Sequence, residues 1–302
     1  MKNKIIFAAL VLFMMASCKK SSDENPQPET PADTTSNSNN NNNNNNNNNP
    51  AVPTSFTQKV LLEQFTGAWC STYPDADYKR DQVLTANSGK VIAVAVHETD
   101  GMELPLIWTL DGIFHTNIPS GMINRTVSTG NVILNQTQWM SNTTVALGKT
   151  AQCGLKVKSS VSGTTASIEV HVGFKSVLTG TNNLTVYLIQ NKVTGTGSGY
   201  NQANAYNTSS GSPFYNLGNP IVNYQHNYVV KKVLTADMGD VIDATKMTVG
   251  GEYIKTFSVS ISGYNQSELY VVAFVNKVGT TSTTHQIMNV QQAKIGTLKD
   301  WD

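Results

Sequence analysis

The chain has 302 residues, which is long enough for two ordinary domains, and 39% of them are apolar, as globular cores require. Its formal net charge is +1, and without Lys2 and Lys4 at the basic start 19 basic residues face 20 acidic ones. The sequence has no basic stripe, so nucleic acid is excluded as an expected partner.

Residues 1–18 have the pattern of a bacterial lipoprotein signal peptide. Two lysines precede an apolar segment from Ile5 to Met15 that is too short to span a bilayer. Residues 16–18, Ala-Ser-Cys, resemble a lipobox, and the resemblance implies that Cys18 becomes a lipidated first residue that anchors the chain to a membrane. The alternative is an ordinary signal peptide with a cysteine at this position by chance.

Residues 19–54 are predicted to form a disordered tether. They are rich in Pro, Thr, Ser and Asn, with unbroken asparagine from Asn39 to Asn49, and contain too few apolar residues for a core. Ser22-Asp23-Glu24 resembles the surface-export signal of lipoproteins in Bacteroidetes, which implies display at the cell surface. If this short match is accidental, the folded part faces the periplasm instead.

The first domain is predicted over 55–150 and begins with a strand, a Trp-Cys pair and a helix. The apolar run 60–65 precedes Trp69 and Cys70, and a helix is expected from Pro74, a residue favoured in a first turn. This is the layout of a thioredoxin active site, which normally carries Cys-x-x-Cys. Here Tyr73 occupies the second cysteine position, so the motif is degenerate.

Three further elements complete this domain. The apolar run 91–96 predicts a parallel strand that is buried on both faces, and one or two short helices are expected within 104–114. Ile118-Pro119-Ser120 resembles the element before the next strand of thioredoxin-like proteins, which implies that Pro119 is cis and lies beside Cys70. A closing helix is predicted over 137–147.

Charged residues within 75–81 indicate the solvent face of the first helix, and Asp77 and Arg80 belong to this set. His97 follows the second strand at the sheet edge where Cys70 is expected. A Cys–His pair is therefore conceivable, but a solvated loop histidine is the simpler interpretation. For Trp69, core packing is preferred over contact with a substrate.

Cys70 and Pro119 are the candidate catalytic residues. The positive end of a helix dipole stabilises a thiolate, so Cys70 could attack a disulfide. Tyr73 cannot resolve the mixed disulfide that results, which disfavours dithiol turnover. Monothiol chemistry stays open, as does a disulfide between Cys70 and Cys153, although Cys153 has the plain interpretation of a buried strand residue.

The second domain, 151–302, is predicted to be an immunoglobulin-like β-sandwich. Apolar and polar residues alternate within 168–174, 257–261 and 269–275, and glycines punctuate these runs. The long segment 194–228 is rich in Tyr, Gly, Asn and Ser, a composition typical of adaptable binding loops. Its aromatic residues could equally tuck against the sandwich.

Five residues are candidates for ligand binding: Trp69, Tyr73, Tyr215, Tyr224 and His226. The five histidines are scattered along the chain, so neither a metal site nor a cofactor is predicted.

Taken together, the chain resembles the Omp28-related family of Bacteroidetes outer-membrane lipoproteins. The resemblance rests on Glu63 to Gly67, Trp69-Cys70, Pro74, Ile118 to Gly121 and Ile123 to Arg125, together with the lipobox and the tether. It implies an α/β thioredoxin-like domain followed by an all-β sandwich. The expected function is a surface-exposed module that binds a protein, peptide or glycan without catalysis. The alternative is a membrane-anchored monothiol redox protein that uses Cys70.

Overall fold

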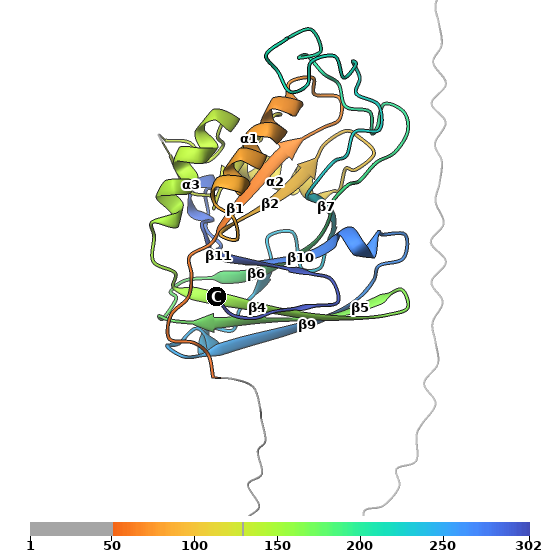
Figure 1. Ribbon diagram of the computed structural model, residues 1–302. Helices are drawn as coiled ribbons and strands as arrows, with labels where there is room; N and C mark the ends of the chain where they lie inside the picture. Colours follow the sequence, from red (N-terminus) through yellow and green to blue (C-terminus); the bar gives the residue numbers. More distant parts are fainter. Residues whose placement is uncertain (1–50, 129) are drawn as a thin grey trace, which may run out of the picture. The chain divides into compact units, whose positions relative to one another are not determined.

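The computed structural model describes residues 51–128 and 130–302, which belong to one compact unit (Figure 1). The predictions for the signal peptide, for Cys18 and for most of the tether lie outside these residues. The described part is mixed α/β, with more residues in strands than in helices. None of its helices is long and apolar enough to cross a lipid bilayer.

The first part alternates strands and helices in the predicted order. Its elements are β1 (Val60–Thr66), α1 (Tyr73–Ala86), β2 (Val91–His97), α2 (Leu106–Phe114), β3 (Ser120–Ile123), a 3-10 turn (Gln136–Gln138) and α3 (Trp139–Leu147). β1 pairs in parallel with β2 and antiparallel with β3. Both β1 and β2 are buried along their whole length, as a strand covered by helices requires.

The second part consists of strands and short turns. Its strands are β4 (Cys153–Ser162), β5 (Thr165–Phe174), β6 (Asn182–Gln190), β7 (Val229–Val233), β8 (Asp240–Val241), β9 (Glu252–Ser260), β10 (Leu269–Lys277), β11 (Ile287–Lys294) and β12 (Leu298–Lys299). Short 3-10 turns lie at Ala244–Lys246, Gln266–Glu268 and Ser282–Thr284. The alternating runs of the sequence thus form β5, β9 and β10.

One sheet joins the two parts of the chain. The eight-stranded sheet has the order β11-β10-β6-β7-β2-β1-β3, with β8 added beside β6, and β7 pairs in parallel with β2 at Ala95 and Val229. The predicted boundary at residue 150 therefore does not separate two sheets. The pairing satisfies backbone groups of β2 that would otherwise form an open sheet edge.

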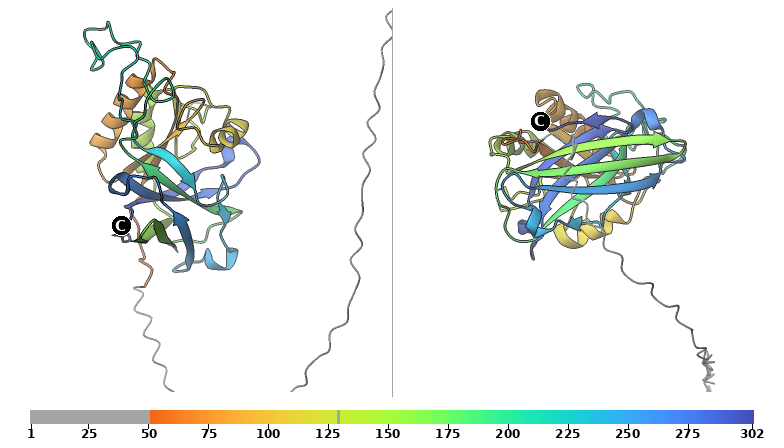
Figure 2. Two further views of the ribbon diagram at one scale, coloured as in Figure 1. Left: turned by 90° about the vertical axis from the view of Figure 1, so that its right-hand side faces the viewer. Right: turned by 90° about the horizontal axis from the view of Figure 1, so that it is seen from below.

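Three hydrophobic clusters cover the faces of this sheet. α2 packs on one face, where Leu110 and Phe114 meet Phe274 of β10. On the opposite face, α1 and α3 cover β1, β2 and β3. The four-stranded sheet β12-β4-β5-β9 covers β6 and β10 on that same face, through residues such as Val170 and Val186. In the right-hand view of Figure 2, the green and blue strands of the four-stranded sheet lie side by side in front of the larger sheet.

Candidate functional site

Cys70 lies in the loop that connects β1 to α1, but its side chain is only 6% exposed. It packs in the same cluster as Tyr73 and Trp139, and its sulfur lies 3.5 Å from the hydroxyl of Thr72. Tyr73 is fully buried at the position of the second cysteine. The motif is therefore part of the core beneath the loop and is not an open surface site.

The two cysteines of the described region are free thiols, which excludes the disulfide between them in this structure. Cys153 lies in β4, within the core between the two sheets, whereas Cys70 belongs to the cluster under α1. Burial raises the pKa of Cys153 to about 12, so this thiol is inert as a nucleophile at neutral pH.

The peptide bond between Ile118 and Pro119 is cis, as the resemblance to thioredoxin-like proteins implies. Ile118 packs against the cluster that contains Cys70. The element that precedes β3 therefore lies near the cysteine loop, whereas a catalytic role for Pro119 stays a prediction.

The long segment between β6 and β7, residues 191–228, is here called the covering loop. It crosses the end of the sheet where β1 and β2 finish, at the top of Figure 1. Gln202 donates a side-chain hydrogen bond to the carbonyl of Cys70, at 2.8 Å. The backbone N–H groups of Ala203 and Ala205 donate to the carbonyls of Ala68 and Ser71, each at 2.8 Å. The chain itself thus occupies one side of the cysteine loop.

Two charges that were predicted on the solvent face of α1 are instead buried: Asp77 and Arg80 form an ion pair, and both are less than 5% exposed. Arg80 also donates to Gln64 of β1 at 2.9 Å. The prediction is wrong because the covering loop lies across this side of the helix. Tyr224 donates its hydroxyl to Asp77 at 2.7 Å, and the Tyr228 ring lies 4.7 Å from the Arg80 guanidinium.

His97 is neither solvated nor bonded to Cys70, contrary to both interpretations of the sequence. It is 1% exposed and its Nδ1 lies 2.7 Å from Asp100. Asp100 also accepts the backbone N–H groups of Ala68 and Met102. Burial alone would raise the pKa of Asp100. The interaction with His97 and the two backbone N–H donors together hold this pKa below its ordinary value. The pair therefore ties the end of β2 to the cysteine loop.

His226 brings the covering loop into the same buried group. Its Nε2 donates to the carbonyl of Tyr200 at 2.8 Å, and its ring lies 5.4 Å from that of His97 and 5.0 Å from that of Tyr224. Burial lowers the pKa of His226 to about 4, and His97 acts in the same direction. His226 is thus a neutral structural residue at pH 7.

The structure separates the five predicted binding residues. Tyr73, Tyr224 and His226 meet in the buried group beneath the covering loop, where they contact other parts of the chain. Trp69 and Tyr215 are accessible, at 50% and 42% exposure, so the core-packing interpretation of Trp69 is wrong. Within the described residues, no cluster of three or more His, Cys, Asp or Glu side chains could hold a metal ion.

Sequence reasoning missed two residues of this group, Asp100 and Gln202. Asp100 stands three positions after His97, a spacing that could have suggested the pair. Gln202 carries no signal in the sequence, because only the path of the covering loop brings it to the Cys70 carbonyl.

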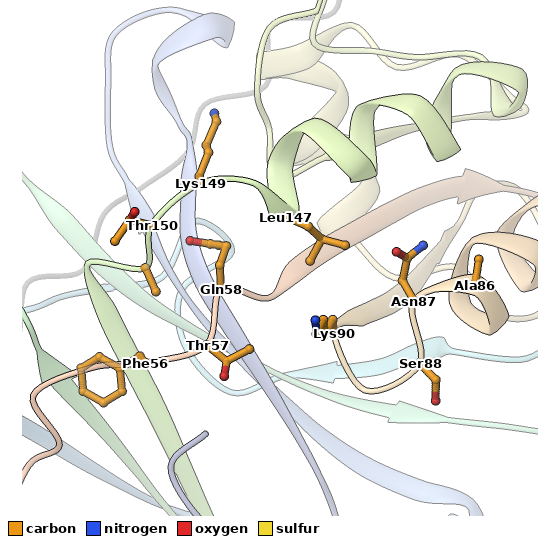
Figure 3. A pocket seen from close by; sticks show the side chains of 11 residues that line it. Phe56, Thr57, Gln58, Ala86, Asn87, Ser88, Lys90, Leu147, Lys149 and Thr150 are labelled. Carbon is orange, nitrogen blue, oxygen red and sulfur yellow. The ribbon is translucent and has the colours of Figure 1, made fainter.

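A surface cavity of about 460 Å³ lies at the far end of α1 from Cys70 (Figure 3). Its lining includes Phe56, Asn87, Lys90, Leu147 and Lys149, from the segment before β1 and the ends of α1 and α3. No candidate residue from the sequence lines this cavity. The cavity therefore lies away from the loop that contains Cys70.

Comparisons with known proteins identify a solved structure with a similar fold and a sequence family that matches this chain. The solved structure of HBP35 of Porphyromonas gingivalis is similar, with 18% sequence identity, a TM-score of 0.64, and coverage of 80% of this chain and 76% of that chain. The protein AGR_C_4864 from Agrobacterium tumefaciens matches at 12% identity and a TM-score of 0.47, with coverage of 82% of this chain and 98% of that chain. No curated protein sequence matches.

At such identities the likeness to HBP35 concerns the fold alone, and it extends over both the helical and the β part. The sequence also matches a family that is described as outer membrane protein Omp28, over residues 110–299. That match spans more than half of the chain and includes strands of both sheets. The chain therefore belongs to the Omp28 family of outer membrane proteins.

Proposed function

We propose that this protein is a lipid-anchored, surface-displayed binding module of the outer membrane whose thioredoxin-like part is not a redox catalyst. Membership in the Omp28 family supports the outer-membrane location. The lipobox at Cys18 supports the lipid anchor, and Ser22-Asp23-Glu24 supports surface display. Protein, peptide and glycan ligands are the classes that such a module would bind.

The observation that carries the non-catalytic role is the cover over Cys70. A thiol that exchanges disulfides must meet a sulfur of its substrate in line, which requires access. Cys70 is 6% exposed, and Gln202 to Ala205 hydrogen-bond to the loop that contains it. The buried Tyr73 offers no second thiol. Binding therefore falls to the exposed surface around this loop.

The strand order supports an immunoglobulin-like assignment for the second part. In one sheet β4 and β5 are neighbours and β9 follows them, whereas β6, β10 and β11 are neighbours in the facing sheet. With β4, β5, β6, β9, β10 and β11 taken as strands A, B, C, E, F and G, the neighbours A-B-E and C-F-G match the two sheets of an immunoglobulin-like sandwich. The four-stranded sheet is completed by β12 beside β4 rather than by a strand D beside β9. In this proposal β7 is the added strand that connects the sandwich to the thioredoxin-like part.

A second candidate function is monothiol redox exchange. One observation favours it: Cys70 lies in the loop directly before the first turn of α1. Exchange would then require the covering loop to open.

Thiol reactivity distinguishes the two functions. In the full chain, purified in detergent, Cys70 is expected to react with an aromatic disulfide reagent at least about 100-fold more slowly than in the denatured chain, because the cover must open first. The Cys153→Ser variant isolates the Cys70 signal. Disulfide exchange with a protein substrate should be equally absent in the wild type and in Cys70→Ser. Wild-type turnover that is lost in Cys70→Ser would overturn the binding proposal.

Surface display predicts that protease added to intact cells cleaves the protein. Removal of the folded part is expected at concentrations that spare a periplasmic marker, because the predicted tether at 19–54 offers an unstructured substrate. A chain in which Ser22, Asp23 and Glu24 are replaced by alanine should become protected. Full protection of the unmodified chain would place the folded part in the periplasm.

A further inference from the structure

A surface beside the covered cysteine combines exposed tryptophans with carboxylates. We call it the Trp–carboxylate surface, and it consists of Trp69, Glu98, Glu103, Trp108 and Asp111. The two tryptophans come from the cysteine loop and from α2, and they are 50% and 52% exposed. Large aromatic side chains that stay half exposed and yet have fixed positions are typical anchors of interaction surfaces.

Trp69 is held against the backbone. Its indole N–H donates to the carbonyl of Glu98 at 2.8 Å. Its ring lies so close to Gly67 that a Cβ at that position would stand 2.4 Å from the indole nitrogen. One side of the ring is therefore fixed by glycine, whereas the remaining surface faces solvent.

Trp108 is connected to Trp69 through the side chain of Glu103 and the peptide group between Glu98 and Thr99. Trp108 donates its indole N–H to Glu103 at 3.2 Å, and Glu103 accepts the backbone N–H of Thr99. The carbonyl of that same peptide group, from Glu98, accepts the hydrogen bond of Trp69. Thr99 has a φ of 54°, a left-handed conformation that is uncommon for threonine. The turn thus holds both indoles in a defined relative position.

The carboxylates of this surface form no ion pair with a cationic side chain of the described residues. Among the ion pairs of residues 51–128 and 130–302, none involves Glu98, Glu103 or Asp111. Burial raises the pKa of Glu98, and the charges of Asp111 and Glu103 raise it further. These mutual effects place the three carboxylates close together, next to the two exposed indole rings.

We propose that the Trp–carboxylate surface binds arginine side chains of an extended polypeptide segment. A guanidinium stacks on an indole face and forms two parallel hydrogen bonds to a carboxylate, so one side chain satisfies both features of the surface. Lysine lacks the planar group, and an anionic lipid headgroup would be repelled by the three carboxylates. This inference rests on the proposed binding role and names its partner class.

Fluorescence anisotropy of a labelled peptide tests the inference. The probe is (Arg-Ser-Ser)3 with blocked ends, and the comparison peptide carries citrulline, a neutral analogue of similar shape, in place of each arginine. The full chain in detergent is expected to bind the arginine peptide at least about tenfold more tightly than the citrulline peptide at low salt. Trp108→Ala and Glu98→Gln are each expected to weaken binding by about fivefold.

Tyr78→Ala provides the matched control, since Tyr78 is an exposed aromatic residue of α1 outside this surface. Its affinity for the arginine peptide should equal that of the wild type, and unfolding midpoints should show that all variants are folded. Equal binding of the wild type and of Trp69→Ala/Trp108→Ala would overturn the inference. So would equal affinity for the citrulline peptide, or no detectable binding of the arginine peptide.

The failure of this inference is distinguishable from the failure of the proposed function. Loss of peptide binding without thiol exchange would leave a binding module with a different ligand. Disulfide exchange that depends on Cys70 would overturn the binding role itself, whether or not the arginine peptide binds.

Discussion

Replacing Glu63 by glutamine is expected to lower the free energy of unfolding by about 3–5 kcal/mol. Glu63 lies in β1 and accepts two hydrogen bonds from Arg125, at 2.8 and 2.7 Å, and both side chains are completely buried. The guanidinium also lies 5.4 Å from the rings of Phe114 and Phe274, which come from α2 and from β10. The substitution would leave a buried arginine charge without its counter-charge.

Urea denaturation followed by tryptophan fluorescence measures this loss. Glu268→Gln is the matched control, because Glu268 pairs with the exposed Lys192, and such pairs contribute about 0–1 kcal/mol. The double variant Glu63→Leu/Arg125→Met should lose less than Glu63→Gln, since no charge remains buried. If Glu63→Gln costs no more than Glu268→Gln, the buried pair does not stabilise the fold as described.

Acidification is expected to cost about 3 kcal/mol of stability through His226 alone. The pKa of this buried residue is about 4 in the folded chain, against an ordinary value of 6.5. As the pH falls below 6.5 the unfolded chain binds a proton that the folded chain does not, so the folded state loses stability until the pH reaches about 4. A difference of 2.5 between the two pKa values corresponds to about 3 kcal/mol.

The His226→Gln variant separates this effect from the titration of carboxylates. Glutamine retains an N–H that can donate toward the carbonyl of Tyr200 but takes up no proton in this range. The free energy of unfolding, measured at several pH values between 7 and 4, should fall more steeply in the wild type than in the variant. Parallel curves would show that His226 does not carry the pH dependence.

Hydrophobic patterns predict most of the local structure of this protein. Val91 to Val96 is apolar throughout and forms the buried strand β2, and the alternating residues 168–174 lie within β5. α1 begins at Tyr73, one residue before Pro74, because proline is accepted in the first turn, where its missing N–H costs nothing. These features depend on near neighbours in the chain, which is why the sequence reveals them.

The candidate site was less accessible to such reasoning. Asp77 and Arg80 lie one turn apart on α1, and their charges predict a solvated helix face, yet the covering loop buries both. Trp69 reads as a core residue, yet it lies half exposed beside the carboxylates. In each case the environment of the side chain is decided by a segment that is distant in sequence.

The sequence by itself determined the order of strands and helices within 55–150, the Trp-Cys motif with Tyr73 at the second cysteine position and the family resemblance, because these depend on local periodicity and on residue types. Only the tertiary structure decided that β7 joins β2 in a common sheet, and that the loop before β7 therefore returns across Cys70. The physical reason is that β7 pairs with the open edge of β2, and no local pattern encodes which edge a strand will meet.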